Sequence, residues 1–390
     1  MNFFNHRLAC VYLTFGVFAS LICGTPAFAQ DSRAAAIADE QAEKAKSLRP
    51  YERSRAERLI TRAVESLSVP PTGFYPAFGS VYSGGGFSLG PAYRHFYGDR
   101  STVDARGLIS IRNYKLAEVG TNSPGHADGH VDLYARASWL DATRVSFYGL
   151  GPDSLRDSRT TFRLRETSVI GGVRARAVRW IVVGGALAYE DFSQSPRNSP
   201  IAGPGADTTY IHSTASAGID WRPSDGYARR GGLYEVRYHN YTDRNDAFSF
   251  DRVDAEVVQH IPILRENWVL SLRGAMQTTL DDGVVPYYML PSLGSGSTLR
   301  AYGSWRFRDR HSELFTAEWR WIPSRLALDL AIFYDAGKVA GVRSDLDFNG
   351  LKSDVGIGAR FHGPAATPLR IEWARGREGM RIVFAGGPAF

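Results

Sequence analysis

The chain has almost no cysteine and, beyond its first 29 residues, no long hydrophobic run. Its two cysteines, Cys10 and Cys23, both lie inside those first residues. The rest of the chain therefore has no disulfide, no thiolate nucleophile and no cysteine metal ligand. No stretch of 18 or more apolar residues follows, which excludes an ordinary membrane-spanning helix there. The sequence also lacks a phosphate-binding loop, a dinucleotide fingerprint and an H-E-x-x-H motif, so we expect neither a cofactor nor a metal ion.

The amino-terminal segment, residues 1–29, has the layout of a secretory signal peptide. Arg7 supplies a positive start, an apolar stretch runs from Leu8 to Cys23, and Ala27-Phe28-Ala29 forms an A-x-A cleavage site. The alternative is a retained anchor helix. The apolar stretch is short for a membrane span and ends in small residues, which favours cleavage after Ala29.

Residues 30–72 differ in composition from the rest and are rich in Ala, Glu, Arg and Lys. Apolar residues recur at helical spacing after Pro50. The sequence Val69-Pro70-Pro71 ends this pattern. It predicts a leader of one or two short amphipathic helices, in the periplasm or inside a barrel mouth. The alternative is a partly disordered leader.

From residue 73 to residue 390 the hydrophobic period becomes two. Phe315, Ala317 and Trp319, for example, alternate with Thr316 and Glu318. Large charged side chains recur on the polar face of one segment after another, as expected for a barrel with a wet interior and an outer face in lipid. The sequence therefore predicts an all-β fold, an antiparallel transmembrane β-barrel of about sixteen strands.

The same alternation locates individual strands. We expect one strand at 103–116, a long loop at 117–127, two strands at 128–139 and 143–150, and a last strand at 379–390. Long and short connections alternate. An even number of strands places both ends of the barrel, the start of its first strand and the end of its last strand, in the periplasm.

These features predict the outer membrane of a Gram-negative cell. The partners would be its lipid and the barrel assembly machinery that inserts the chain. The formal net charge is +6, but the arginines are spread over many strands, so the sequence does not indicate nucleic-acid binding.

The most informative motif lies between the eleventh and twelfth predicted strands. A glycine-rich approach leads into Leu299-Arg300-Ala301-Tyr302. Alternation places Glu318 and Asp335 on inward positions of the next two strands. A guanidinium that folds into a narrow lumen needs a fixed anionic partner, so we predict that Arg300 pairs with these carboxylates. The alternative is that all three are ordinary solvated charges of the lumen.

This motif resembles the [VL]-R-G-[FY] signature of the BamA/TamA superfamily of outer-membrane insertases, also called bacterial surface antigens. Ala301 replaces the usual glycine. Three further segments are similar to the family pattern: 147–154, 220–234, and the F-x-D-x-G strand that contains Gly337. The resemblance covers about residues 73–390. It implies that Glu318 and Asp335 anchor the loop, and that the first and last strands form a weak seam.

The resemblance also implies a role in the insertion or translocation of outer-membrane proteins, without a cofactor or a catalytic residue. Client barrels or a periplasmic partner would then bind the protein. Family members recruit clients with periplasmic domains of about 75 residues, and the segment 30–72 is too short for one. We therefore expect a stand-alone barrel that works with a separate partner.

The last predicted strand ends in an aromatic carboxy-terminal residue. Phe384 and Phe390 share the parity of Met380 and Ile382, which we expect to face lipid. An apolar strand with this ending resembles the assembly signal of outer-membrane barrels.

Two other functions compete with the insertase hypothesis. One is a passive channel or structural barrel. The other is a lipase that uses Ser88, because Gly86-Phe87-Ser88-Leu89-Gly90 matches the G-x-S-x-G elbow. That elbow needs a strand, a sharp turn and a helix, whereas Ser88 lies inside a strand pattern, so we expect no enzyme. His212 and His239 are expected in the lumen or in loops.

Overall fold

The computed structural model describes two units of the chain, Met1–Arg55 and Ala56–Phe390. The described residues are 27–47, 58, 72–98, 100–197, 201, 203–264, 266–280, 282–323, 327–363 and 366–390. In the first unit they form one helix, α1 (Ala27–Ser47), which begins at the predicted cleavage site. The helical pattern predicted after Pro50 and most of the predicted signal peptide lie outside the described residues. None of the described helices has the length and apolar character that a membrane span requires.

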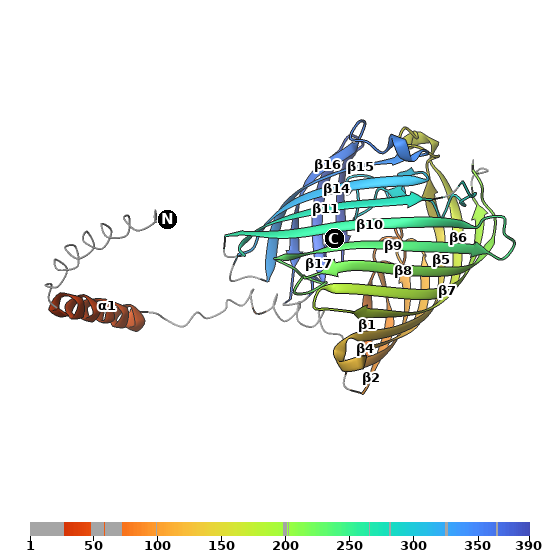
Figure 1. The fold of residues 1–390 in the computed structure, drawn as a ribbon. Coiled ribbons are helices and arrows are strands. Elements are labelled where there is room, and N and C mark those ends of the chain that lie inside the picture. The colour runs from red at the N-terminus through yellow and green to blue at the C-terminus, as the bar shows by residue number, and fades with distance from the viewer. Residues whose placement is uncertain are drawn as a thin grey trace, which may run out of the picture. The chain divides into compact units, whose positions relative to one another are not determined.

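In the second unit, sixteen strands form one antiparallel sheet in which each strand pairs with the next along the chain (Figure 1). The all-β class and the count of sixteen strands are confirmed. The strands are β1 (Gly73–Gly79), β2 (Ser88–Tyr97), β3 (Ser101–Ser110), β4 (Lys115–Gly125), β5 (Val131–Phe147), β6 (Thr160–Arg176), β7 (Ile181–Pro196), β8 (Thr208–Asp220), β9 (Gly231–Asp243), β10 (Phe250–Leu264), β11 (Trp268–Thr279), β14 (His311–Trp321), β15 (Leu328–Ala340), β16 (Lys352–Phe361), β17 (Leu369–Gly376) and β18 (Gly379–Ala385). Short helical turns are α3 (His126–Gly129), η1 (Arg156–Ser158) and η2 (Arg343–Asp345).

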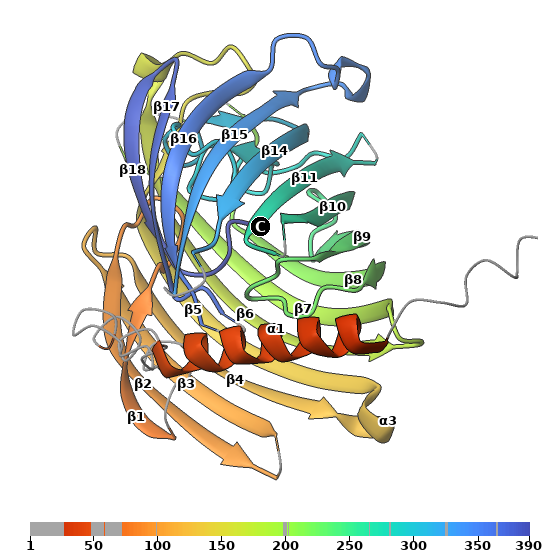
Figure 2. The same ribbon diagram turned by 90° about the vertical axis from the view of Figure 1, so that its left-hand side faces the viewer.

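The sheet curves into a nearly closed barrel (Figure 2). Over the described residues its two edge strands, β1 and β18, are not hydrogen-bonded to each other. We call the boundary between them the seam. The end of the barrel at which residues 280–310 leave the sheet is the loop end, and the opposite end is the termini end.

The outer face of the barrel is apolar and exposed over most strands. Large side chains such as Leu187, Ile332 and Ile357 are 60%, 63% and 56% exposed. A continuous apolar surface of this extent is far larger than soluble proteins leave open, and it fits the hydrocarbon core of a bilayer. The inward positions between these residues carry many of the charged side chains, as the alternation predicted.

Two of the predicted strand boundaries are wrong, and their errors cancel in the count. The segment 103–116 contains the end of β3, a four-residue turn and the start of β4, so the loop predicted at 117–127 is strand up to Gly125 and then begins α3. The turn contains no Gly or Pro that would have indicated it in the sequence. Instead, Asn113 adopts the left-handed φ of 63°. The Ser110 side chain accepts the backbone N–H of Tyr114 at 2.9 Å.

The opposite error occurs in β5. Residues 140–142, predicted as a turn, lie inside one strand of 17 residues. The register shifts between Ala142 and Val145 because a β-bulge inserts an extra residue there. A bulge interrupts the alternation without ending the ladder, which is why the pattern suggested two strands.

The last strand is also shorter than predicted. β18 ends at Ala385, and Phe384 is 66% exposed on the outer face. Gly387, with a φ of 81°, then turns the chain away from the sheet, and Pro388 has no N–H to continue the ladder. The carboxy-terminus lies inside the curve of the sheet (Figure 2), so Phe390 is not on the lipid-facing parity.

Candidate functional site

The long connection between β11 and β14, residues 280–310, folds back into the barrel. We call it the inner loop. Its first part packs an aromatic layer against the inner walls of the barrel. Tyr287 lies edge-on to Phe162, with ring centroids 4.9 Å apart, and the hydroxyls of Tyr288 and Thr208 are 2.8 Å apart. All four residues are buried, so this layer fixes the loop near the loop end.

A short ladder then narrows the loop into a hairpin. β12 (Ser292–Leu293) pairs with β13 (Phe307–Arg308). Gly294 has a φ of 103°, and a Cβ at this position would lie 2.3 Å from the carbonyl oxygen of Gly303. Only glycine fits so close an approach. The hairpin tip therefore presents Leu299 to Tyr302 to the wall formed by the last strands.

Arg300 is the centre of this tip and is 2% exposed. Its Nε and Nη2 donate to the two carboxylate oxygens of Asp335 at 2.7 and 2.8 Å. Nη1 donates to Glu372 at 2.8 Å and to Glu318 at 3.3 Å. The guanidinium also lies 3.4 Å from the centroid of the Phe333 ring.

A second ring of charges balances the carboxylates. Arg360 donates to both Glu318 and Glu372. Arg370 donates to the other oxygen of Glu372 at 2.5 Å. Burial lowers the pKa of the Arg300 guanidinium, but the hydrogen bonds with Asp335 and the nearby Glu372 and Glu318 outweigh it, so its pKa lies above the ordinary value. Arg300 therefore stays charged in this network.

The neighbours of Arg300 fit the loop to the wall by shape. The backbone N–H of Ala301 donates to Asp354 at 3.0 Å. Leu299 and Tyr302 are buried. A Cβ on Gly337 would lie 2.9 Å from Leu293, and one on Gly376 would lie 3.1 Å from Tyr302, so both glycines make room for the loop. Ala301 is not among the residues with positive φ, and the family's glycine is not needed for backbone conformation here.

The structure thus brings Arg300, Glu318 and Asp335 together, with Gly337 beside them. Sequence reasoning missed Glu372, Arg360 and Arg370. The sequence did contain a signal for two of them. Arg370 and Glu372 alternate with the apolar Ile371 and Trp373, which places the two charged side chains on the inward face of that strand. The curvature of the sheet, which brings β17 within reach of the loop, was not visible in the pattern.

The inner loop also contacts both sides of the seam. On the β1 side, the indole N–H of Trp305 donates to the Ser83 carbonyl at 2.9 Å. On the β18 side, Arg381 donates to the Tyr302 carbonyl. A Cβ on Gly296 would lie 2.6 Å from the Val383 side chain. The inner loop therefore contacts β18 and the connection between β1 and β2, one on each side of the seam, from inside the barrel.

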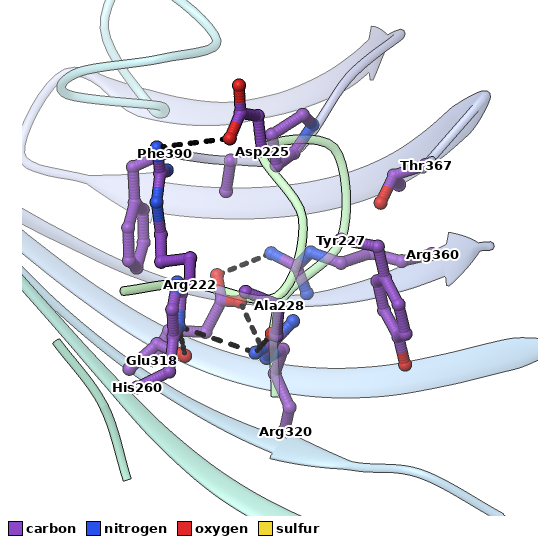
Figure 3. Close-up of a pocket in the computed structure, with 13 residues that line it drawn as sticks. Arg222, Asp225, Tyr227, Ala228, His260, Glu318, Arg320, Arg360, Thr367 and Phe390 are labelled. Atoms are coloured by element: carbon purple, nitrogen blue, oxygen red, sulfur yellow. Dashed lines mark hydrogen bonds and ion pairs between the residues drawn. The ribbon is translucent and has the colours of Figure 1, made fainter. Parts of the chain in front are cut away.

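The termini end holds a pocket next to the charge network (Figure 3). Its lining includes Arg320, Arg360 and the carboxy-terminal Phe390. The Phe390 ring lies parallel to that of His260, with centroids 6.2 Å apart. Gly387 N–H donates to the Thr367 carbonyl at 2.8 Å, and this bond holds the tail in place.

The residues proposed for other chemistry are arranged differently. Ser88 starts β2, and the chain continues as strand rather than helix. Its hydroxyl has no hydrogen-bond partner among the described residues. His212 Nε2 and His239 Nδ1 are 3.0 Å apart, on the inner face of the barrel wall, and the other ring nitrogen of His212 lies beside Glu190. The described part of the chain contains no group of three or more residues arranged to hold a metal ion.

No protein-family model and no curated protein sequence matches the chain. Several solved structures share its fold. BamA from Haemophilus ducreyi lacking POTRA domains 1-3 aligns with a TM-score of 0.59 and 14% identity, covering 81% of this chain and 70% of that one.

Two structures of CdiB align in the same way. CdiB from Escherichia coli gives a TM-score of 0.57 with 10% identity, and CdiB from Acinetobacter baumannii gives 0.54 with 9% identity. They cover 82% and 80% of this chain, which spans 63% and 58% of their own length. At these identities the likeness concerns the barrel fold.

Proposed function

We propose that this protein is an outer-membrane barrel of the BamA/TamA surface-antigen type that helps to insert or translocate other proteins. The observation that carries the proposal is the seam. Two seven-residue edge strands, β1 and β18, remain unpaired with each other over the described residues. The Arg300 network anchors the loop that joins them. The barrel fold shared with BamA and CdiB supports the proposal, and so does the apolar outer face.

The chemistry needed is strand pairing rather than bond cleavage. An edge strand exposes a row of backbone N–H and C=O groups, which is a template for a strand of another chain. The inner loop holds β18 and the connection between β1 and β2 in place while the seam is empty. A client strand would add to β1 or β18 once the loop releases one edge. The start of β1 and the end of β18, both at the termini end, would then lie in the periplasm, as the even strand number implies.

A reversible disulfide between the inner loop and β18 tests this mechanism. A Cβ on Gly296 would lie 4.0 Å from the Cβ of Val383, which suits a disulfide. We expect oxidised Gly296→Cys/Val383→Cys protein in liposomes to lose its acceleration of client-barrel folding, and reduction to restore it. The measurement is the rate at which a urea-unfolded client barrel becomes heat-modifiable on a gel.

The matched control is Gly120→Cys/Arg136→Cys, which joins the register partners of β4 and β5 with a Cβ distance of 3.7 Å. This bond should leave the folding rate unchanged. Equal activity of the oxidised and reduced loop variants would refute release of the loop from β18. If the parent protein conducts ions but never accelerates client folding, the alternative of a passive channel or structural barrel is correct.

A further inference from the structure

Five cations gather on the outer face of three neighbouring strands where these reach the loop end. β4, β5 and β6 are consecutive in the sheet (Figure 1). The cations near this end, which we call the basic rim, are Lys115, Arg144, Arg163 and Arg165 on these strands and Arg159, one residue before β6. The strand register places Lys115 opposite Asp141, and Asp141 opposite Arg165. One carboxylate, Asp141, therefore lies between Lys115 and Arg165.

The positions of the basic rim face outward, away from the lumen. The residues on the opposite parity, Leu140, Ala142 and Leu164, are 6%, 0% and 2% exposed and pack inside the barrel. The next outward-facing residue of β5, moving from Asp141 toward the middle of the barrel wall, is Trp139, which is 40% exposed. The next outward row contains Val169, 54% exposed. The basic rim thus continues directly from the apolar belt.

Its distance along the strands places it at the membrane interface. At the termini end of the same strand pair, Val131 is in register with Ala175. Arg165 lies ten residues from Ala175 along β6. About 9–11 residues of tilted strand cross the hydrocarbon core. The basic rim therefore lies where the headgroups of one leaflet begin.

Most of the charge of the rim is not neutralised within the chain. Arg163 donates to both oxygens of Asp141 at 2.7 and 2.6 Å, and Arg165 lies 4.0 Å from the same carboxylate. Among the described residues, Lys115, Arg144 and Arg159 form no ion pair within 4.0 Å; the Arg159 Nε donates to the Ser146 hydroxyl at 3.1 Å. Lys115, Arg144 and Arg165 are exposed.

The outward positions of other strands near the loop end carry acids instead. They include Asp191 on β7, Asp251 on β10 and Glu313 on β14. Outward cations on other strands near this end, Lys338 on β15 and Arg375 on β17, stand singly, so the cluster of five lies in one sector of the circumference. A general attraction to an anionic surface would not require this restriction, whereas a local ligand would.

We propose that the basic rim binds the phosphorylated headgroup of a lipid in the leaflet at the loop end. Guanidinium groups match phosphate oxygens in pairs of hydrogen bonds. The acyl chains would lie on the apolar belt below, across Trp139 and Val169. The site lies on the barrel wall away from the seam, so it does not depend on insertase activity.

Native mass spectrometry of the full chain in neutral detergent tests the proposal, with bisphosphorylated lipid A as the probe. The variant is Lys115→Gln/Arg144→Gln/Arg165→Gln, which leaves Arg163 to pair with Asp141. We expect the parent to retain the lipid and the variant to bind it roughly a hundredfold more weakly, since each of the three cations removed contributes about 1 kcal/mol near a membrane surface. Heat modifiability on a gel confirms that the variant is folded.

The control removes the same charge at the termini end, with Arg176→Gln/Arg179→Gln/Arg230→Gln, and should bind as the parent does. Dephosphorylated lipid should bind no better to the parent than to the rim variant. Equal lipid A binding by parent and rim variant would overturn the proposal. Displacement of the lipid by millimolar inorganic phosphate would also overturn it, because the rim would then be a site for free phosphate.

Discussion

At the scale of single residues, the main energetic feature is the buried network around Arg300. Charges taken out of water are tolerated only when they are paired and hydrogen-bonded. Here the guanidinium of Arg300 meets Asp335, Glu372 and Glu318, and Arg360 and Arg370 balance the remaining charge. Removing one member leaves its partners buried without a counter-charge. The network therefore fixes the position of the inner loop more strongly than its apolar contacts alone would.

Replacement of Arg300 by alanine should destabilise the folded barrel. Breaking a buried ion pair by removing one partner costs about 3–5 kcal/mol, and Asp335→Ala should have a similar effect. The measurement is the temperature at which the folded band disappears on a gel. Arg106→Ala is the control, because its pair with Glu118 is half exposed and contributes at most about 1 kcal/mol. Unchanged melting of both Arg300→Ala and Asp335→Ala would contradict the anchoring role.

At the scale of elements, the ends of strands depend on interactions that alternation does not record. The bulge in β5 preserves one long strand, and the side chain of Ser110 supports a turn without glycine or proline. The early end of β18 is likewise due to residues that alternation does not record. Gly387 and Pro388 release the tail from the ladder, and the tail then enters the pocket at the termini end.

Deletion of residues 386–390 should raise the single-channel conductance, because the tail lines the pocket beside Arg320 and Arg360. The strand ladder is retained, since Ala385 still pairs with Arg370, so the protein should refold into liposomes. Phe384→Ala is the control on the outer face and should leave conductance unchanged. An unaltered conductance after the deletion would show that the tail does not restrict the lumen.

The same variants separate this role from an assembly signal. If Phe390 directs assembly in cells, Phe390→Ala lowers the amount of folded barrel in membranes while refolding of the purified chain in liposomes is normal. A loss in both settings would instead indicate a contribution to stability through the contact with His260.

At the scale of the whole molecule, segments of the chain narrow the lumen of the barrel at both ends. The inner loop packs Tyr287 and Tyr288 against the walls near the loop end. The connection between β8 and β9 folds inward at the other end, where Tyr227 stacks on His362 at 4.1 Å. A lumen narrowed in this way fits the proposed role at the seam better than the alternative of an open pore.

This closure gives a prediction for the leader. Because barrel segments already narrow the described lumen at both ends, removal of residues 31–70 should leave the single-channel conductance unchanged. The measurement compares full-length and shortened protein in planar bilayers. A clear increase on removal would show that the leader enters the lumen as a plug.

The sequence by itself determined the fold class, the number of strands, the orientation of most side chains and the pairing of Arg300 with two carboxylates. These follow from local alternation, because each strand must present one face to lipid and the other to the lumen. Only the tertiary structure decided that Glu372 and Arg360 complete the network, and that Phe390 turns inward. It also revealed that Lys115 and Arg165 meet across Asp141. These contacts join residues far apart in the chain, and they depend on the curvature and register of the sheet.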